Sequence, residues 1–407
     1  MEKVLDISKI REEFPILQEQ VNGKPLVYFD NAASSQKPIS VIETISNYYM
    51  RAHANIHRGV HTLSQKATSK YEAVRENLAD YIGAESKEII FTRGTTEAIN
   101  LFASTYGAEN LKPGDEVIIS TLEHHSNMVP WHMWCKKTGA ILKIIPINDA
   151  GELDLEAYTE LLNEKTKIVS VAHVSNTLGT VNDVKFIIQK AHEFGAVVLL
   201  DGAQALPHIE VNVNDLDCDF YASSAHKMYG PTGIGFLYGK AELLEKMPPY
   251  HGGGEMIKSV SLLESTYADL PFKFEAGTPN IADTIGFGAA IDFLKKYGAE
   301  NIAAHEKMLH DYATEELSKI EGIRFIGTSK HKAGVISFLI GDIHPYDLGV
   351  ILDQLGIAVR TGHHCTEPLM QRFNIPGTVR ASFAIYNTKE EVDQFIAGVK
   401  RAQRMLS

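Results

Sequence analysis

The sequence contains few cysteines, no long apolar run and no run of basic residues. Its three cysteines, Cys135, Cys218 and Cys365, are too few and too scattered to form the disulfide framework of a small secreted protein. No apolar stretch approaches the roughly 20 residues that a membrane-spanning helix needs. The opening segment MEKVLDISKIREEFP also lacks the apolar core of a signal peptide. These absences predict a cytoplasmic protein that does not span a membrane.

The sequence also contains fewer positively charged than negatively charged residues. The 407 residues include 39 Lys and Arg against 51 Asp and Glu, which gives a formal net charge of -12. A protein that binds DNA or RNA needs a basic face to neutralise phosphates, so nucleic acid is not an expected partner. The length and the hydrophobic content of 44% instead indicate two globular domains and a small-molecule substrate.

Short runs rich in β-branched residues alternate with helical segments through much of the chain. Nearly continuous apolar runs of this kind are typical of strands buried on both faces of a mostly parallel sheet. We predict strands over 88–94, 116–125, 141–147, 167–176, 196–204, 219–227 and 233–239, and helices over 95–106, 127–138, 154–163 and 183–194. The pattern predicts an α/β fold with a doubly wound, mostly parallel seven-stranded sheet.

The predicted sheet and its helices define a large domain over residues 26–285. Beyond it, long helical segments precede two strand-like runs, 333–340 and 377–386, and a C-terminal helix. This order is typical of a smaller α+β domain. We expect the N-terminal segment to join that domain, which is then built from residues 1–25 and 286–407.

Polar side chains follow several of the predicted strands, and in an open α/β sheet ligands bind at the carboxyl ends of the strands. The first strand is followed by Gly94, Thr95 and Thr96. Two hydroxyls and the free N–H groups of a helix that starts there suit a phosphate. An ordinary helix cap explains the same residues, so these residues alone leave the two alternatives open.

An acid and an amine end two other strands. Asp201 follows the apolar run AVVLL, and Lys227 closes the segment SSAHK one strand later. Taken singly, Asp201 reads as a cap and Lys227 as a surface residue. Together with a phosphate cradle they fit pyridoxal phosphate, because its protonated pyridine nitrogen needs an acid and its aldehyde needs an amine. The combination therefore predicts this cofactor.

Six motifs together resemble the class V aminotransferase family of fold-type I pyridoxal-phosphate enzymes. They are NIHRGVHTLS, HVSNTLGTV, DGAQALPH, SSAHKMYGPTGIGFLYG, FEAGTPN and RTGHHC. Within this family the chain resembles the Suf-type, or group II, cysteine desulfurases from about residue 10 to its C-terminus. The resemblance implies a homodimer that converts L-cysteine to L-alanine and leaves the sulfur as a persulfide on Cys365.

The resemblance also implies a role for each residue around the cofactor. Lys227 would form an imine with the aldehyde and then take a proton from the substrate. Asp201 would keep the pyridine nitrogen protonated, and Gln204 would donate to the phenolic oxygen. His124 would stack on the ring and transfer protons. The phosphate would be bound by Thr95, Thr96, Ser224 and His226, and by Thr278 of a second subunit.

Recognition of cysteine requires a cation for its α-carboxylate. The resemblance places Arg380 in this role, which suits a planar guanidinium because it can donate two parallel hydrogen bonds. A surface ion pair is the alternative explanation of Arg380. Asn176, Arg360 and His57 are expected to line the same pocket.

Histidines raise the alternative of a metal site. His53, His57 and His61 recur every four residues, but Gly59 interrupts the helix and no carboxylate completes the set. Two histidines also precede Cys365, yet no second cysteine stands at ligand spacing. No metal is therefore predicted, and a zinc-binding scaffold protein is the alternative outside catalysis.

Turn-forming residues surround Cys365 in the segment RTGHHCTEP, so we expect this thiol in a partly exposed loop. Cys135 and Cys218 stand in helix and strand contexts that suit packing. Arg360 and the two neighbouring histidines, when protonated, would favour the Cys365 thiolate. By resemblance, a small sulfur-acceptor protein of iron–sulfur cluster assembly would collect the persulfide. A selenocysteine lyase or another class V aminotransferase remains the alternative activity.

Overall fold

The structure, a computed structural model, describes residues 5–406. Within them seven strands form one sheet in the order β4-β10-β9-β8-β7-β5-β6, with only β10 antiparallel to the rest. The strands are β4 (Ile89–Thr92), β5 (Glu116–Ser120), β6 (Ile141–Ile145), β7 (Thr166–Ala172), β8 (Val197–Asp201), β9 (Phe220–Ser224) and β10 (Gly235–Gly239). Each lies within or overlaps one of the predicted runs, so the predicted mostly parallel seven-stranded sheet is confirmed.

Side chains of each strand alternate between two apolar clusters on opposite faces of this sheet. Ile118 of β5 and Leu200 of β8 pack in one cluster, whereas Val117, Ile119 and Leu199 pack in the other. Because successive strand residues point to opposite faces, both faces must be covered for all of them to be buried. This double burial is why the strands appear in the sequence as continuous apolar runs.

Helices provide that cover. They are α2 (Ile39–Arg51), α3 (Thr62–Ile82), α4 (Thr95–Phe102), α5 (Ala108–Asn110), α6 (Val129–Thr138), α7 (Leu155–Leu161), α8 (Val184–Glu193), α9 (Val213–Leu216), α10 (Ala241–Lys246) and α11 (Ile281–Tyr297). Several begin at a side-chain cap: Asp183 accepts the N–H of Phe186 at the start of α8. By contrast, α4 has no side-chain cap, so its first N–H groups remain available to other partners.

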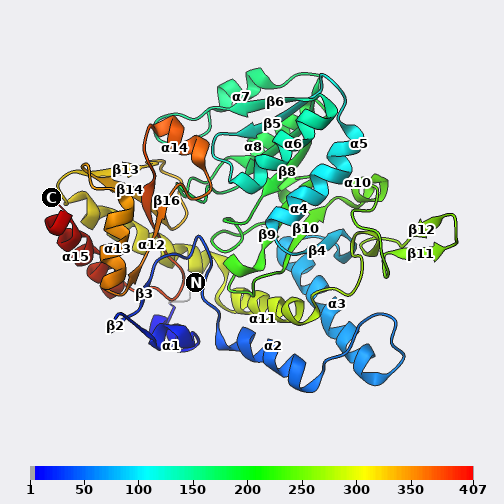
Figure 1. The fold of residues 1–407 in the computed structure, drawn as a ribbon, viewed down its shortest axis with the longest axis horizontal. Helices are drawn as coiled ribbons and strands as arrows, with labels where there is room; N and C mark the ends of the chain where they lie inside the picture. The colour runs from blue at the N-terminus through cyan, green and yellow to red at the C-terminus, as the bar shows by residue number, and fades with distance from the viewer. Residues whose placement is uncertain (1–4, 407) are drawn as a thin grey trace.

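A smaller α+β unit lies beside the large sheet, on the left in Figure 1. Its four-stranded sheet has the order β13-β14-β17-β16. Its elements are β13 (Ile323–Ile326), β14 (Val335–Ile340), β16 (Arg360–Gly362), β17 (Thr378–Ser382), α12 (Ala299–Ser318), α13 (Pro345–Gln354), α14 (Glu367–Phe373) and α15 (Lys389–Leu406). The sequence predicted β14, β17 and α15. It missed β13 and β16 because strands of three or four residues carry too little periodicity.

The N-terminal segment contacts both parts of the molecule. Ile10 and Phe14 pack in one of the two clusters on the large sheet, whereas β3 pairs in parallel with β15 beside the smaller sheet. The remaining elements are α1 (Ile7–Glu12), β1 (Gln20–Val21), β2 (Lys24–Pro25), β3 (Val27–Tyr28), β15 (Ile357–Ala358) and a protruding hairpin of β11 (Ile257–Val260) and β12 (Ser265–Tyr267), shown in Figure 1. The division into 26–285 and 1–25 with 286–407 therefore stays a prediction. None of the helices among the described residues is long and apolar enough to cross a membrane.

A buried ion pair joins α3 to the segment before α11. Arg75, only 1% exposed, donates from Nη1 and Nη2 to the two carboxylate oxygens of Glu275 at 2.7 and 2.9 Å. Glu275 also accepts the N–H of Phe91 in β4 at 2.8 Å. The carboxylate therefore holds a helix, a strand and a loop together, and its loss leaves a guanidinium buried with Glu72 as its remaining carboxylate partner.

We expect Glu275→Ala to lower the free energy of unfolding by about 3 kcal/mol, because breaking a buried pair leaves the Arg75 guanidinium with one carboxylate partner instead of two. Glu264→Ala, which changes an exposed glutamate of the hairpin loop, is the matched control and should change stability by less than about 0.5 kcal/mol. Denaturant unfolding followed by circular dichroism measures both. Equal stability of the two variants would contradict the structural role of Glu275.

Candidate active site

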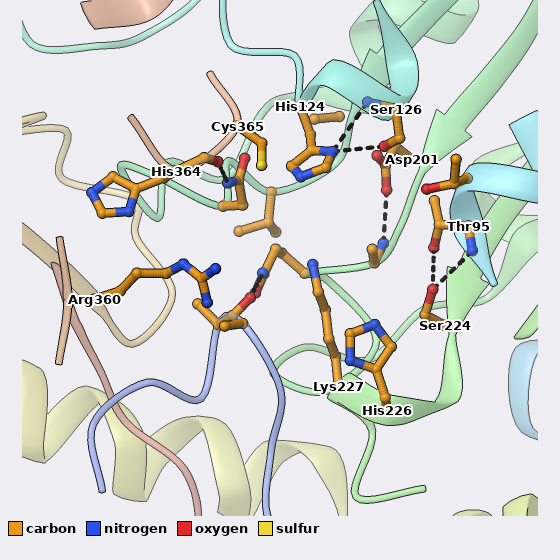
Figure 2. Close-up of a pocket in the computed structure, with 18 of the residues that line it drawn as sticks. Thr95, His124, Ser126, Asp201, Ser224, His226, Lys227, Arg360, His364 and Cys365 are labelled. Carbon is orange, nitrogen blue, oxygen red and sulfur yellow. Dashed lines mark hydrogen bonds between the residues drawn. The ribbon is translucent and has the colours of Figure 1, made fainter. Parts of the chain in front are cut away.

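A cavity of about 220 Å³ lies where the carboxyl ends of the large sheet's strands meet the smaller unit. Residues from both parts line it, and Figure 2 shows many of their side chains pointing into the same space. The predicted site residues among them are Thr95, Thr96, His124, Asn176, Asp201, Gln204, Ser224, His226, Lys227, Arg360, Cys365 and Arg380. The structure therefore brings these side chains together, while their individual roles stay predictions.

The N-terminus of α4 forms one end of the cavity. Ser224, at the end of β9, accepts the N–H of Thr95 at 2.8 Å, and its hydroxyl lies 2.8 Å from the Thr95 hydroxyl. Gly94 has a φ of 148°, and a Cβ on it would lie 3.1 Å from the Ser224 hydroxyl. Glycine thus allows the strand and the helix to approach closely. Hydroxyls beside the remaining N–H groups of a helix N-terminus suit a phosphate group.

Lys227 follows β9 in a short 3-10 turn, and its amine points into the cavity in Figure 2. Among residues 5–406 the amine has neither a hydrogen-bond partner nor an ion-pair partner. Burial lowers its pKa to about 8, and the nearby Arg380 acts in the same direction, while Asp201 opposes them. A larger share of this amine is therefore neutral at physiological pH than of a surface lysine, which makes it a candidate nucleophile and base.

Two side chains at the carboxyl end of β8, Asp201 and Gln204, have polar atoms available to a ligand. Asp201 is 6% exposed, and its carboxylate accepts the N–H of Ala203 at 3.0 Å. Burial raises its pKa, against the effects of this hydrogen bond and of Lys227. The Nε2 of Gln204 donates to the carbonyl of Ala32 at 2.5 Å, and its Oε1 is buried with no partner in the part of the chain that the structure describes. One amide N–H of Gln204 therefore remains for a ligand.

His124 lies after β5 and faces the cavity in Figure 2. Its Nδ1 accepts the N–H of Ser126 at 3.1 Å and lies 2.8 Å from the Ser126 hydroxyl. Burial lowers the pKa of His124 to about 3, and the charge of Lys227 lowers it further in the same sense. The ring is therefore neutral, and the hydrogen bond to Nδ1 assigns its proton to Nε2. His226 is also neutral, because burial lowers its pKa to about 4.

Two arginines share one carboxylate at the opposite end of the cavity. Arg360 and Arg380 are paired across β16 and β17. The two carboxylate oxygens of Asp30 lie 3.2 Å from Arg380 Nη2 and 3.3 Å from Arg360 Nη1. Arg380 is 2% exposed, and burial lowers its pKa to about 10. Its Nε is buried and has no hydrogen-bond partner among the described residues. Two guanidinium groups against one carboxylate leave one positive charge for an anionic ligand.

Cys365 is exposed in the turn between β16 and α14, and Figure 2 shows its sulfur facing the ring of His124. His364 turns away, and its Nε2 lies 2.8 Å from the hydroxyl of Thr378. Burial lowers the pKa of His364 to about 2, so the prediction that this histidine can supply a cation beside Cys365 is wrong. Of the expected cations, Arg360 lines the same cavity.

The other two cysteines are buried. Cys135 packs with the apolar cluster that includes Trp131, and burial raises its pKa to about 11. Cys218 packs in the cluster on the other face, and burial raises its pKa as well. Both thiols are therefore protonated near neutral pH and screened from reagents.

Two predicted site residues lie elsewhere. His57 does not line the cavity, which corrects the prediction for a single chain: its Nε2 lies 2.8 Å from the Glu72 carboxylate on α3, and its ring packs edge-on against Phe272. Thr278 borders a separate cavity of about 520 Å³, so its expected contact needs a second subunit and stays a prediction. No group of three His, Cys, Asp or Glu side chains within residues 5–406 is arranged to hold a metal ion.

Sequence reasoning missed Asp30, Ser126 and the anchoring contacts of the Cys365 loop. Asp30 had a usable signal, because it ends the apolar run LVYF in the same way as Asp201 ends AVVLL. Ser126 had none, since a serine two residues after a histidine is common in turns.

Comparisons with known proteins agree with this geometry. The family model of aminotransferase class-V matches residues 27–395. The chain is 52% identical to a cysteine desulfurase of Dickeya dadantii over 402 residues, covering 98% of this chain and 97% of the relative. It is also 52% identical to a probable cysteine desulfurase of Halalkalibacterium halodurans over 400 residues, covering 98% of each.

Solved structures show the same similarity. The chain superposes on the crystal structure of the cysteine desulfurase CsdA from Escherichia coli with a TM-score of 0.93 and 40% identity, covering 100% of both chains. The apo structure of a cysteine desulfurase from Thermococcus onnurineus gives a TM-score of 0.95, also with 40% identity and 100% coverage of both chains. The chain belongs to the aminotransferase class-V family.

Proposed function

We propose that this protein is a pyridoxal-phosphate-dependent cysteine desulfurase that converts L-cysteine to L-alanine. The observation that carries the proposal is the convergence of an unpaired amine, a buried carboxylate, a pair of arginines and an exposed thiol on one cavity. The names of relatives about half identical over nearly the whole chain support it. An aminotransferase would need the amine, the carboxylate and the arginines, but not the thiol of Cys365.

The residues at the sheet edge fit the cofactor. Thr95, Thr96, Ser224 and His226 would hold its phosphate at the N-terminus of α4. Asp201 would pair with the pyridine nitrogen, and the free N–H of Gln204 would reach the phenolic oxygen. Lys227 would form the covalent attachment. When bound, pyridoxal phosphate supplies an electron sink that makes the bonds of the substrate α-carbon labile.

The arginine pair would bind the α-carboxylate of L-cysteine. Asp30 occupies one side of each guanidinium, and Arg380 also donates from Nη1 to the carbonyl of Asn176 at 2.9 Å. The unpartnered Nε of Arg380 and the surplus positive charge of the pair remain for the substrate. The clamp would orient the substrate so that its sulfur faces Cys365.

Proton and sulfur movements follow from the protonation states. Lys227, with its pKa of about 8, would take the proton from the α-carbon. The Cys365 thiolate would attack the substrate sulfur, so that a sulfur–sulfur bond forms as the carbon–sulfur bond breaks. The electron pair left on carbon takes up the proton that Lys227 removed, which His124 would relay by accepting one proton as it donates another. L-cysteine and one thiol thus give L-alanine and one persulfide, without an external oxidant.

We infer three further properties in the same way. Thr278 would complete the phosphate site of a second subunit, so the protein would be a homodimer. The exposure of Cys365 suits transfer of the persulfide to a small sulfur-acceptor protein of iron–sulfur cluster assembly. Such transfer belongs in the cytoplasm, where thiols are kept reduced.

Replacement of Cys365 tests the reaction. Cys365→Ala and Cys365→Ser should keep the visible absorbance of the bound cofactor, because the residues proposed to hold the cofactor do not include this thiol, but should lose alanine formation. After wild-type protein is incubated with cysteine, mass spectrometry should find one extra sulfur on the peptide that holds Cys365. Cys135→Ala and Cys218→Ala are the controls and should form alanine at a near-normal rate. Sulfur on either of those thiols, or full activity without Cys365, would falsify the proposal.

The pKa of Lys227 predicts how fast the cofactor attaches at each pH. Only a neutral amine attacks an aldehyde, so imine formation by the cofactor-free protein should accelerate with rising pH around a midpoint of about 8. A surface lysine would give a midpoint at about pH 10.4. Stopped-flow absorbance measurements from about pH 6 to about pH 10 give the rate of imine formation.

Two variants sharpen that measurement. Lys227→Ala should show no imine absorbance at any pH. Asp201→Asn should move the midpoint to lower pH, because it removes the charge that raises the pKa of Lys227. A midpoint that stays near that of a surface lysine would contradict the assignment of Lys227 as the attachment site.

The proposed assembly predicts a mass of two chains, each of 45.0 kDa, in sedimentation equilibrium at micromolar concentration. Thr278→Val should weaken cofactor binding, because a phosphate contact is lost in both composite sites. Thr328→Val, at an exposed threonine of the smaller unit, is the control. A fully active monomer would rule out composite sites.

A further inference from the structure

The loop that carries the nucleophile has an uncommon backbone conformation. His364 has a φ of 52° and Cys365 a φ of 58°, so two successive non-glycine residues lie in the left-handed region. L-residues rarely adopt this conformation, and it persists only where surrounding contacts hold it. The contacts that hold this loop therefore determine where the Cys365 sulfur lies.

Those contacts come from the large sheet's side of the cavity. The backbone N–H of His125 donates to the carbonyl of Cys365 at 2.8 Å. The side chain of Asn176 donates to the carbonyl of His364, also at 2.8 Å. One residue further along, the hydroxyls of Thr177 and Thr366 are 2.8 Å apart.

His125 holds the loop at a second point through its side chain. Its Nε2 accepts the backbone N–H of Glu367 at 3.1 Å. Glu367 is the first residue of α14, where a backbone N–H has no partner within the helix. Both contacts of His125 therefore hold the chain on the C-terminal side of the Cys365 side chain, one at the carbonyl of Cys365 and the other at the N–H two residues later.

We propose that His125 is a positioning residue for the Cys365 nucleophile and acts as the hydrogen-bond acceptor of the Glu367 N–H. Because Nε2 accepts an N–H, the ring is neutral with its proton on Nδ1. His124, its neighbour in the chain, lines the same cavity as Cys365, so one dipeptide supplies both a ring in the cavity and the contacts that hold the thiol loop. The proposal rests on the proposed function only for the role of Cys365 in the reaction.

Two substitutions separate the acceptor from the shape of the ring. His125→Gln keeps an acceptor, Oε1, at about the position of Nε2, whereas His125→Phe keeps the ring and removes the acceptor. In the cofactor-bound protein, hydrogen–deuterium exchange of the peptide that spans residues 360–370 should accelerate about tenfold in H125F and change little in H125Q. This readout does not depend on turnover.

The kcat for alanine formation should distinguish the two variants in the same way as hydrogen–deuterium exchange does. H125F should reduce kcat for alanine formation by roughly 10-fold to 100-fold, because the nucleophile is misplaced, while KM for cysteine and the cofactor absorbance stay close to the wild type. H125Q should retain most of the wild-type kcat. His132→Phe, at an exposed histidine of α6, is the control and should alter neither readout.

Equal effects of H125F and H125Q on exchange and kcat would overturn the acceptor role, as would an H125F protein that matches the wild type. If H125F does not fold, His125→Ala makes the same comparison with H125Q. If the wild type forms no alanine from cysteine, the proposed function fails, and the exchange data alone still decide whether His125 holds the loop.

Discussion

The site depends on one residue at the junction of the two parts, Asn176, which follows β7 at the carboxyl edge of the large sheet. Its side chain donates to the carbonyl of His364, and its own carbonyl accepts a hydrogen bond from Arg380. One strand end thus holds both the nucleophile loop and the arginine of the carboxylate clamp. The amine of Lys227 follows β9 of the same sheet. This junction therefore fixes the positions of the groups that would bind the substrate relative to those that would react with it.

Burial tunes the charges that meet at this junction. Lys227, Arg360 and Arg380 face Asp30 and Asp201, so these five side chains carry one surplus positive charge when all are ionised. Burial lowers the pKa of Lys227 and of Arg380 and raises that of Asp201, so each group is held closer to its neutral form than in water. A bound phosphate and a bound carboxylate would stabilise the charged forms of the two cations, because the surplus positive charge attracts anions.

The sequence predicted the strands of the large sheet well, but it predicted the contacts made at the ends of those strands less well. Doubly buried strands are strongly apolar, so all seven runs were recognisable, and the polar residues that end them, such as Asp201 and Lys227, marked the cavity edge. Asp30 and the bonds of His125 escaped because they join segments more than 200 residues apart, and no local pattern reports such contacts. Within a single chain His57 lies outside the cavity, because its ring pairs with Glu72, 15 residues further along the chain on α3.

The Cys365 loop shows why local sequence and distant contacts must be read together. Glycine and proline near a cysteine indicate a turn, and the turn indeed exposes the thiol. They do not indicate that His364 and Cys365 take left-handed conformations, which unaided L-residues disfavour. That conformation is held by donors and an acceptor that lie after β5 and β7, so the position of this thiol depends on the contact between the two parts as well as on the motif that contains it.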